Sequence, residues 1–90
     1  MALKQKKSNK KSSQKKDESL FLILHNDDIN TFNHVIESLV EICNHDDIQA
    51  EQCAYITHYK GKCDVKIGSF NELSLMKDQL HSKGLTTTIE

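Results

Sequence analysis

Several features that would assign a chain to a familiar class are missing from these 90 residues. No apolar run approaches the ~20 residues that a membrane-spanning helix needs. No apolar segment follows the N-terminal lysines, as a secretory signal would require. The three cysteines include no C-x-x-C pair, so neither a disulfide framework nor a zinc site is indicated. A reducing, cytoplasmic setting is therefore expected.

Motifs for catalysis and cofactor binding are missing too. The sequence has no Gly-rich phosphate loop, no nucleophile paired with a base and no metal-ligand spacing. Four of its histidines have no second metal ligand at i, i+4 spacing: His25, His34, His45 and His81. We therefore expect a protein that is not an enzyme and that binds no metal and no cofactor.

Charge divides the chain into two parts. Residues 1–16 hold seven of the twelve lysines and few apolar side chains, so residues 1–18 are predicted to be a disordered Lys-rich extension. Residues 17–90 carry five lysines and all thirteen acids, a net charge of −8. Residues 19–90 are long enough for one domain with one modest core.

The basic extension leaves a second class of function open. A small acidic protein-interaction domain could use such a tail to bind nucleic acid or another acidic surface. The acidic domain behind the tail argues against a folded nucleic-acid platform, and no aromatic residues are interleaved with the lysines for base stacking.

Hydrophobic periodicity predicts the element order β-α-α-β-α-β. The expected strands cover 20–24, 63–67 and 85–89, and the expected helices cover 32–43, 48–58 and 70–83. The first helix has an i, i+3, i+4, i+7 apolar stripe, which Asn30 or Thr31 can cap. The second strand alternates Cys63, Val65 and Ile67 inward. With so few strands, the fold class is α+β, a three-stranded antiparallel sheet with three helices packed on one face.

The stretch LILHNDDINTF places Asn26, Asp27 and Asp28 directly after the first strand. The simplest interpretation of these three residues is a solvated turn. If the first two helices form an antiparallel hairpin, however, His58 at the end of the second helix faces this loop. Acceptors that converge from different directions suit a primary ammonium group, which has three donors and no acceptor.

Apolar or small side chains should lie beneath this polar rim. They come from the first strand and from the facing sides of the two helices: Leu24, Phe32, Val35, Ala54 and Thr57. A polar rim over an apolar hollow matches an ammonium group whose own carbon carries a hydrophobic side chain. The sequence therefore predicts a binding site rather than a catalytic one.

The segments LHNDDINTF and AYITHYKGK, with the strand and capped helix that follow, resemble the ClpS family of adaptors for Clp proteases. The resemblance implies an adaptor that recognises N-degrons and delivers them to an AAA+ unfoldase, with its flexible leader reaching into that partner. It assigns α-amino binding to Asn26, Asp27 and His58, supported by Asp28. It assigns the side-chain pocket to Leu24, Asn30, Phe32, Val35, Ala54, Thr57 and Leu85.

The sequence departs from that family pattern in the pocket. Asn30-Thr31-Phe32 stands where the family usually has Thr-Pro-Met, Ala54 stands where Met is common, and Thr57 replaces an aliphatic residue. The paired acids are also similar to the magnesium pocket of response-regulator receivers. That interpretation is disfavoured, because the chain is too short for five β-α units and no later strand ends in the required Asp and Lys.

Overall fold

The computed structural model describes residues 20–90, so the predicted Lys-rich extension lies outside the described residues. The elements follow the predicted order: β1 (Leu20–His25), α2 (Phe32–Cys43), α3 (Asp47–Lys60), β2 (Lys62–Gly68), α4 (Phe70–Ser82) and β3 (Thr86–Ile89). Among the described residues, no helix combines the length and hydropathy that a membrane crossing needs.

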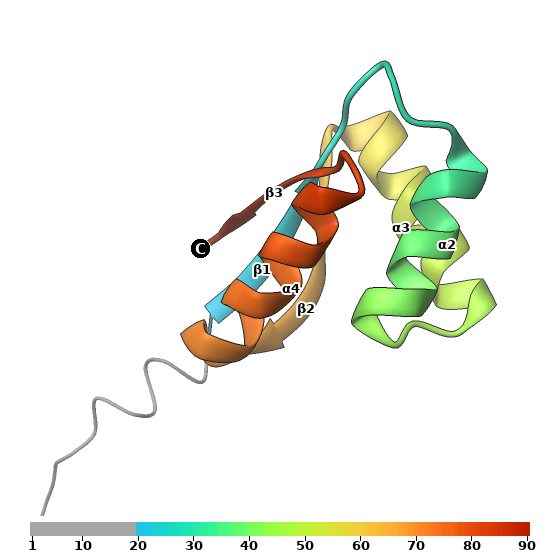
Figure 1. The fold of residues 1–90 in the computed structure, drawn as a ribbon. Coiled ribbons are helices and arrows are strands. Elements are labelled where there is room, and N and C mark those ends of the chain that lie inside the picture. Colours follow the sequence, from blue (N-terminus) through green and yellow to red (C-terminus); the bar gives the residue numbers. More distant parts are fainter. Residues whose placement is uncertain (1–19) are drawn as a thin grey trace, which may run out of the picture.

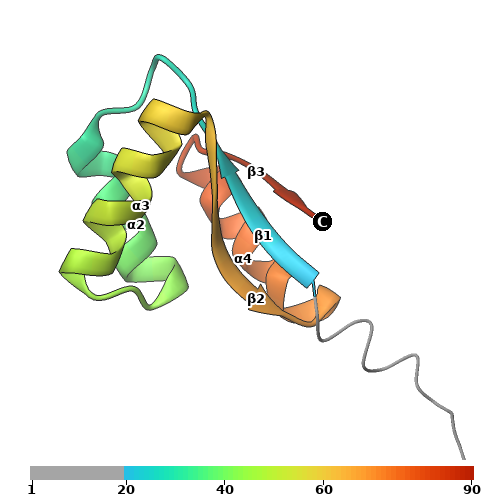
Figure 2. The same cartoon turned by 180° about the vertical axis from the view of Figure 1, so that it is seen from behind.

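The three strands form one antiparallel sheet in the order β2-β1-β3, so the apolar strand β1 is central. Figures 1 and 2 show α4 lying across one face of the sheet and the α2–α3 hairpin packing beside it, along β2. In the described part of the chain, no helix covers the opposite face (Figure 2). The predicted α+β class with an antiparallel sheet is confirmed.

One side chain of β2 points the other way from the prediction. Cys63 and Val65 are buried, but Ile67 is 57% exposed. The pairing with β1 is irregular here: Leu22 lies opposite Lys66, whereas Ile23 lies opposite Asp64. A residue inserted into one strand shifts the alternation by one, so the simple period-2 pattern was wrong for Ile67.

Side chains close the helix ends. The Thr31 hydroxyl accepts the His34 N–H at the start of α2, and the Asp46 carboxylate accepts the Gln49 N–H at the start of α3. At α4, the capping box predicted between Ser69 and Glu72 is present in full.

The helix α3 runs two residues further than expected, to Lys60. It ends at Gly61, whose φ of +95° lies in the left-handed region that glycine adopts without strain. The Gly61 N–H donates to the Thr57 carbonyl and closes the last turn. The Gly in HYKGK therefore fixes where the chain leaves α3 and enters β2.

One continuous core joins the sheet to all three helices. Its buried members are Leu22, Leu24, Leu39, Cys43, Ala50, Cys53, Cys63, Val65, Leu73, Leu80 and Leu85. Burial raises the pKa of the Cys43 thiol to about 11 and that of Cys63 to about 12, and it also raises the pKa of Cys53. The three thiols are therefore protonated packing groups at neutral pH, not nucleophiles.

Candidate functional site

A cavity of about 50 Å³ opens where the β1–α2 loop, the C-terminal end of α3 and the start of β3 meet. Figures 1 and 2 both place the end of α3 beside this loop, as the predicted antiparallel hairpin requires. The volume exceeds the roughly 10–15 Å³ that one water molecule needs. The cavity is lined by Leu24, His25, Asn26, Asp27, Asn30, Phe32, Val35, Ala54, Thr57, His58 and Leu85.

The structure thus brings together every residue predicted for the site except Asp28. Asp28 is exposed in the same loop and does not line the cavity. His25 lines it without having been predicted, and its Nε2 lies 2.8 Å from the Thr88 hydroxyl on β3. Its place as the last residue of β1, directly before Asn26, is the signal that could have found it.

Asp27 folds the loop on itself. Its Oδ1 accepts the backbone N–H groups of Ile29 and Asn30 at 2.9 and 2.8 Å, and its Oδ2 accepts the Asn30 side-chain amide at 2.9 Å. Carboxylate oxygens have two lone pairs each, so only Oδ2 keeps one for a further donor. Asp27 can therefore offer a ligand its charge and one hydrogen bond, either direct or through water.

The same contacts set the charge state of Asp27. Partial burial raises its pKa, but the hydrogen bonds from Asn30 and Ile29 and the nearby His34 ring outweigh that effect. The pKa of this carboxyl therefore lies below the ordinary value of 3.8. A hydrogen-bonded carboxylate favours its ionised form, so the cavity rim carries a fixed negative charge near neutral pH.

Asn30 ties the loop to the far wall of the cavity. Its amide donates both to Asp27 and, at 2.9 Å, to the carbonyl of Gly84. Gly84 has a φ of +87°, which turns the chain from α4 towards β3 and brings the buried Leu85 to the cavity. Thr31, and not Asn30, caps α2, which leaves the Asn30 side chain available for this bridge.

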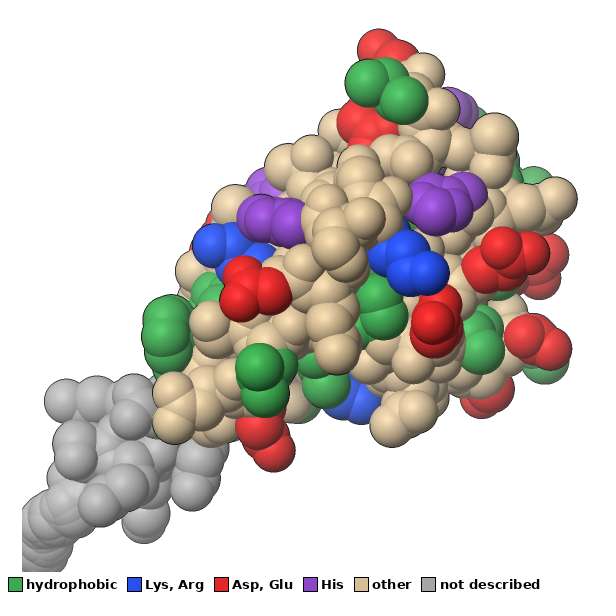
Figure 3. Space-filling model, in the orientation of Figure 1, with side chains coloured by type: hydrophobic (Ala, Val, Ile, Leu, Met, Phe, Trp, Pro, Cys, Tyr) green, Lys and Arg blue, Asp and Glu red, His purple; other side chains and the backbone are tan. Residues whose placement is uncertain are grey.

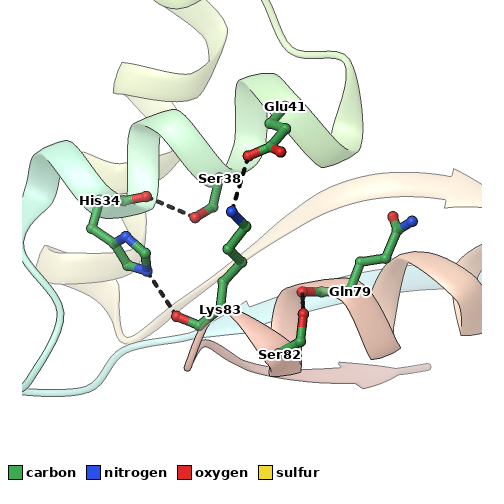
Figure 4. Close-up of polar contacts among 6 residues, drawn as sticks. All are labelled: His34, Ser38, Glu41, Gln79, Ser82 and Lys83. Atoms are coloured by element: carbon green, nitrogen blue, oxygen red, sulfur yellow. Dashed lines mark hydrogen bonds and ion pairs between the residues drawn. The ribbon is translucent and has the colours of Figure 1, made fainter.

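Contacts from α2 hold the same wall from the other side (Figure 4). The His34 ring donates from Nε2 to the Lys83 carbonyl at 2.7 Å, and the Lys83 ammonium lies 3.2 Å from Glu41. The exposed ion pair adds little energy by itself, but together these contacts fix the turn that carries Leu85.

His58 stands at the mouth of the cavity. Its ring packs against Phe32, with centroids 5.3 Å apart, and edge-on against Tyr59, at 4.8 Å. The Asn26 backbone N–H donates to the Gly61 carbonyl at 2.9 Å, which joins the loop to the end of α3. The side chains of Asn26 and His58 are exposed and line the cavity, so a ligand at its mouth can reach both.

The floor of the cavity is apolar. Ala54 and Thr57 are 3% and 5% exposed and lie one turn apart on α3. The Thr57 hydroxyl donates to the Cys53 carbonyl at 2.8 Å inside the same helix, so its hydrogen is already used. Thr57 therefore presents to the cavity little more polarity than the aliphatic side chain it replaces.

The surroundings are acidic. Residues 20–90 carry eleven carboxylate side chains and five lysines. Figure 3 shows acidic groups over α2 and at the β1–α2 loop. Within residues 20–90, no three His, Cys, Asp or Glu side chains are arranged to hold a metal ion. An acidic rim beside an apolar floor can hold a small cationic group attached to an apolar one.

Comparison with known families decides the assignment. The model of the ATP-dependent Clp protease adaptor protein ClpS matches residues 15–88. The chain belongs to the ClpS family. No curated protein sequence matches this ClpS family member. Its fold is similar to that of Agrobacterium tumefaciens ClpS2 bound to L-phenylalaninamide, with a TM-score of 0.71 and 18% identity, covering 82% of this chain and 96% of that one.

Proposed function

We propose that this ClpS family member is a non-catalytic adaptor for N-degrons. It binds the free α-amino group and the large hydrophobic side chain of a substrate's first residue, and it delivers the substrate to an AAA+ Clp unfoldase-protease in the cytoplasm. The observation that carries the proposal is the shared cavity, in which Asn26, Asp27 and His58 stand over an apolar floor. The phenylalaninamide bound to the Agrobacterium protein, a free amine beside an aromatic side chain, supports the same ligand chemistry.

The rim matches the three donors of an ammonium group. The Asn26 carbonyl and a neutral His58 ring nitrogen each offer an acceptor, and Asp27 adds an ionised carboxylate. Hydrogen bonds to an ionised partner are about twice as strong as neutral ones, so the amine contributes a large part of the affinity. Asp28, exposed beside the rim, strengthens the negative potential without touching the ligand.

The side-chain end of the ligand fills the hollow over Ala54 and Thr57. Leu24, Val35 and Leu85 close its sides, and Phe32 stands at the entrance as a ring that is 41% exposed. Burial of an apolar side chain there contributes about 1.5–3 kcal/mol, which selects large hydrophobic first residues over small ones.

Fluorescence anisotropy with short peptides tests the binding step. Peptides that begin with Phe or Leu, with a free or an acetylated amine, differ only in the group that the rim recognises. Acetylation should weaken binding at least tenfold, because it removes the charge and leaves acceptors unpaired at about 1–3 kcal/mol each. Equal affinity for the acetylated peptide would refute amine recognition.

The delivery step needs its own measurement. A Phe-initiated reporter protein should be degraded by a Clp unfoldase-protease faster when this adaptor is added, and an acetylated reporter should not. A chain that lacks residues 1–18 should still bind the peptide but should lose the acceleration, since the leader is proposed to engage the unfoldase. Acceleration that survives this deletion would remove the leader from the mechanism.

A further inference from the structure

The mouth of the cavity continues into a row of exposed rings along α3. Phe32 packs against Tyr55 with ring centroids 5.4 Å apart, and Tyr55 stacks on Tyr59 at 5.6 Å with only 15° between the ring planes. Tyr55 is 52% exposed and Tyr59 is 71% exposed. Phe32 therefore belongs both to the cavity lining and to this aromatic row, so the two surfaces are continuous.

A second hollow adjoins the row at Tyr55. It measures about 330 Å³ and is lined by Glu51, Gln52, Tyr55 and Ile56. Glu51 precedes Tyr55 by four residues, so the carboxylate and the ring lie on the same side of the helix. Lys60 lies about 140° around the helix axis from Tyr55, on another side. A half-exposed aromatic ring beside a carboxylate, next to the cavity proposed to hold the first residue, suits a planar cation.

We propose that Tyr55 and Glu51 form a second subsite, which binds an arginine side chain at the second position of the substrate. This inference rests on the proposed function, because it takes the first residue to be held in the cavity. The chain leaving the cavity crosses Phe32, and the guanidinium then lies on the Tyr55 ring with Glu51 at its edge. Arginine suits this place because its guanidinium stacks on aromatic rings and pairs with carboxylates.

The expected preference is modest, because both partners are exposed. A cation on an exposed aromatic ring gains a factor of about two to five in affinity. The contribution of Glu51 is smaller and should decline as salt is added. A second residue with a negative charge should bind more weakly than a neutral one, because acids outnumber lysines in residues 20–90.

The test compares Phe-initiated peptides that carry arginine or citrulline at the second position, using fluorescence anisotropy with the full chain. Citrulline keeps the size of arginine and loses its charge. The arginine peptide should bind about two- to fivefold tighter than the citrulline peptide. Tyr55→Phe should keep this ratio, whereas Tyr55→Leu, which retains bulk and loses the ring, should bring it close to one.

A control variant and further peptides show whether the preference comes from this subsite. Ile48→Ala, an exposed change at the other end of α3, should leave the ratio as it is. A ratio near one in the unchanged protein, a ratio that survives Tyr55→Leu, or a preference that appears only with arginine at the third position would each overturn the subsite. Acetylated copies of the peptides report on amine recognition. If they bind as well as the free-amine peptides, the proposed function is wrong, and the subsite that rests on it is wrong too.

Discussion

Two four-residue segments of the same composition lie at opposite ends of the α2–α3 hairpin. HNDD, residues 25–28, leads into α2, and NHDD, residues 44–47, joins α2 to α3. Each contains one Asn, one His and two Asp. In the second segment most of the polar groups close the turn, whereas His25, Asn26 and Asp27 of the first segment border a cavity.

NHDD forms the closed end of the hairpin, where most of the polar groups have a hydrogen-bond partner. Asn44 adopts a left-handed φ of +60° and donates its N–H to the Leu39 carbonyl, as a helix C-cap does. The buried His45 ring donates from Nε2 to the Val65 carbonyl at 2.7 Å, and Asp46 caps α3. The Nδ1 of His45 is the exception: it is buried without a hydrogen-bond partner in the described part of the chain.

HNDD lies at the open end of the hairpin, the end with the cavity, and fewer side chains hold this loop. Asp27 and Asn30 hold the loop, and the side chains of Asn26 and His58 are exposed at the cavity. What differs is the structure opposite each segment. The backbone of β2 meets the closed end, and the cavity meets the open one. Residue type alone therefore does not separate a cap from a ligand-binding group; the facing element does.

The largest predicted effect comes from replacing, one at a time, the histidine at each end of the hairpin. His58→Ala should reduce affinity for a Phe-initiated peptide at least tenfold and leave the urea midpoint nearly unchanged, because the ring is exposed. His45→Ala should lower the free energy of unfolding by about 1–3 kcal/mol, because it removes a buried hydrogen bond, and should leave affinity intact at temperatures where the domain is folded. Loss of binding from both variants alike would erase the contrast between the ends.

The second prediction uses pH. The pKa of Asp27 is held below 3.8, so the carboxylate stays ionised from pH 7.5 to 5.5. Its stabilising contribution is present above the ordinary carboxyl pKa and is lost only as pH falls through the lower folded value. The charge that Asp27 offers to an ammonium group is therefore constant across this interval.

Asp27→Asn, which keeps an oxygen acceptor but loses the charge, should therefore weaken peptide binding by the same factor at every pH between 7.5 and 5.5. Anisotropy titrations at four or five pH values measure both proteins. A loss that shrinks towards pH 5.5 would mean that the Asp27 carboxylate already gains its proton there, against the lowered pKa.

The sequence predicted the structure correctly where short-range rules act. Apolar periodicity located the helices, the Ser69–Glu72 spacing located a capping box, and hairpin geometry placed His58 beside the Asn26 loop. It failed where the outcome depends on pairing between distant segments. The irregular register that turns Ile67 outward is one example, because nothing within β2 itself marks it.

The bridge from Asn30 to Gly84 spans 54 residues, and a local pattern could only suggest a helix cap for Asn30. Tyr55 was overlooked for a different reason. It lies beside the floor residue Ala54 but points outward, and its i, i+4 spacing with Tyr59 becomes meaningful only once Phe32 is seen to reach both the cavity and this row.

The third prediction concerns Asp46, an acid at the closed end. Asp46→Ala removes the cap of α3 and should cost about 1 kcal/mol of stability, within the usual range of 0.5–2, with no change in peptide affinity. Asp46→Asn should recover most of that loss, since an amide oxygen also accepts from the Gln49 N–H. Urea unfolding of the two variants, beside anisotropy, measures both quantities. A weaker peptide affinity in Asp46→Ala would mean that the closed end transmits strain to the cavity.

The smallest predicted effect concerns the size of the open end. Ala54 is buried in the cavity floor, and Met there would add three heavy atoms towards a hollow of about 50 Å³. An open floor should accept β-branched or bulky first residues, such as Ile or Trp, at a gain of about 0.8 kcal/mol for each further buried CH₂, close to fourfold. Ala54→Met should therefore sharpen the preference for Leu and Phe over Ile by a similar factor, measured by anisotropy with free-amine peptides. Phe32 acts against this expectation, because its ring is stiffer than a Met side chain and stands at the entrance of the same hollow. If Ala54→Met leaves the order of preference unchanged, Phe32 rather than Ala54 sets the size limit, and Phe32→Met becomes the variant that should widen it.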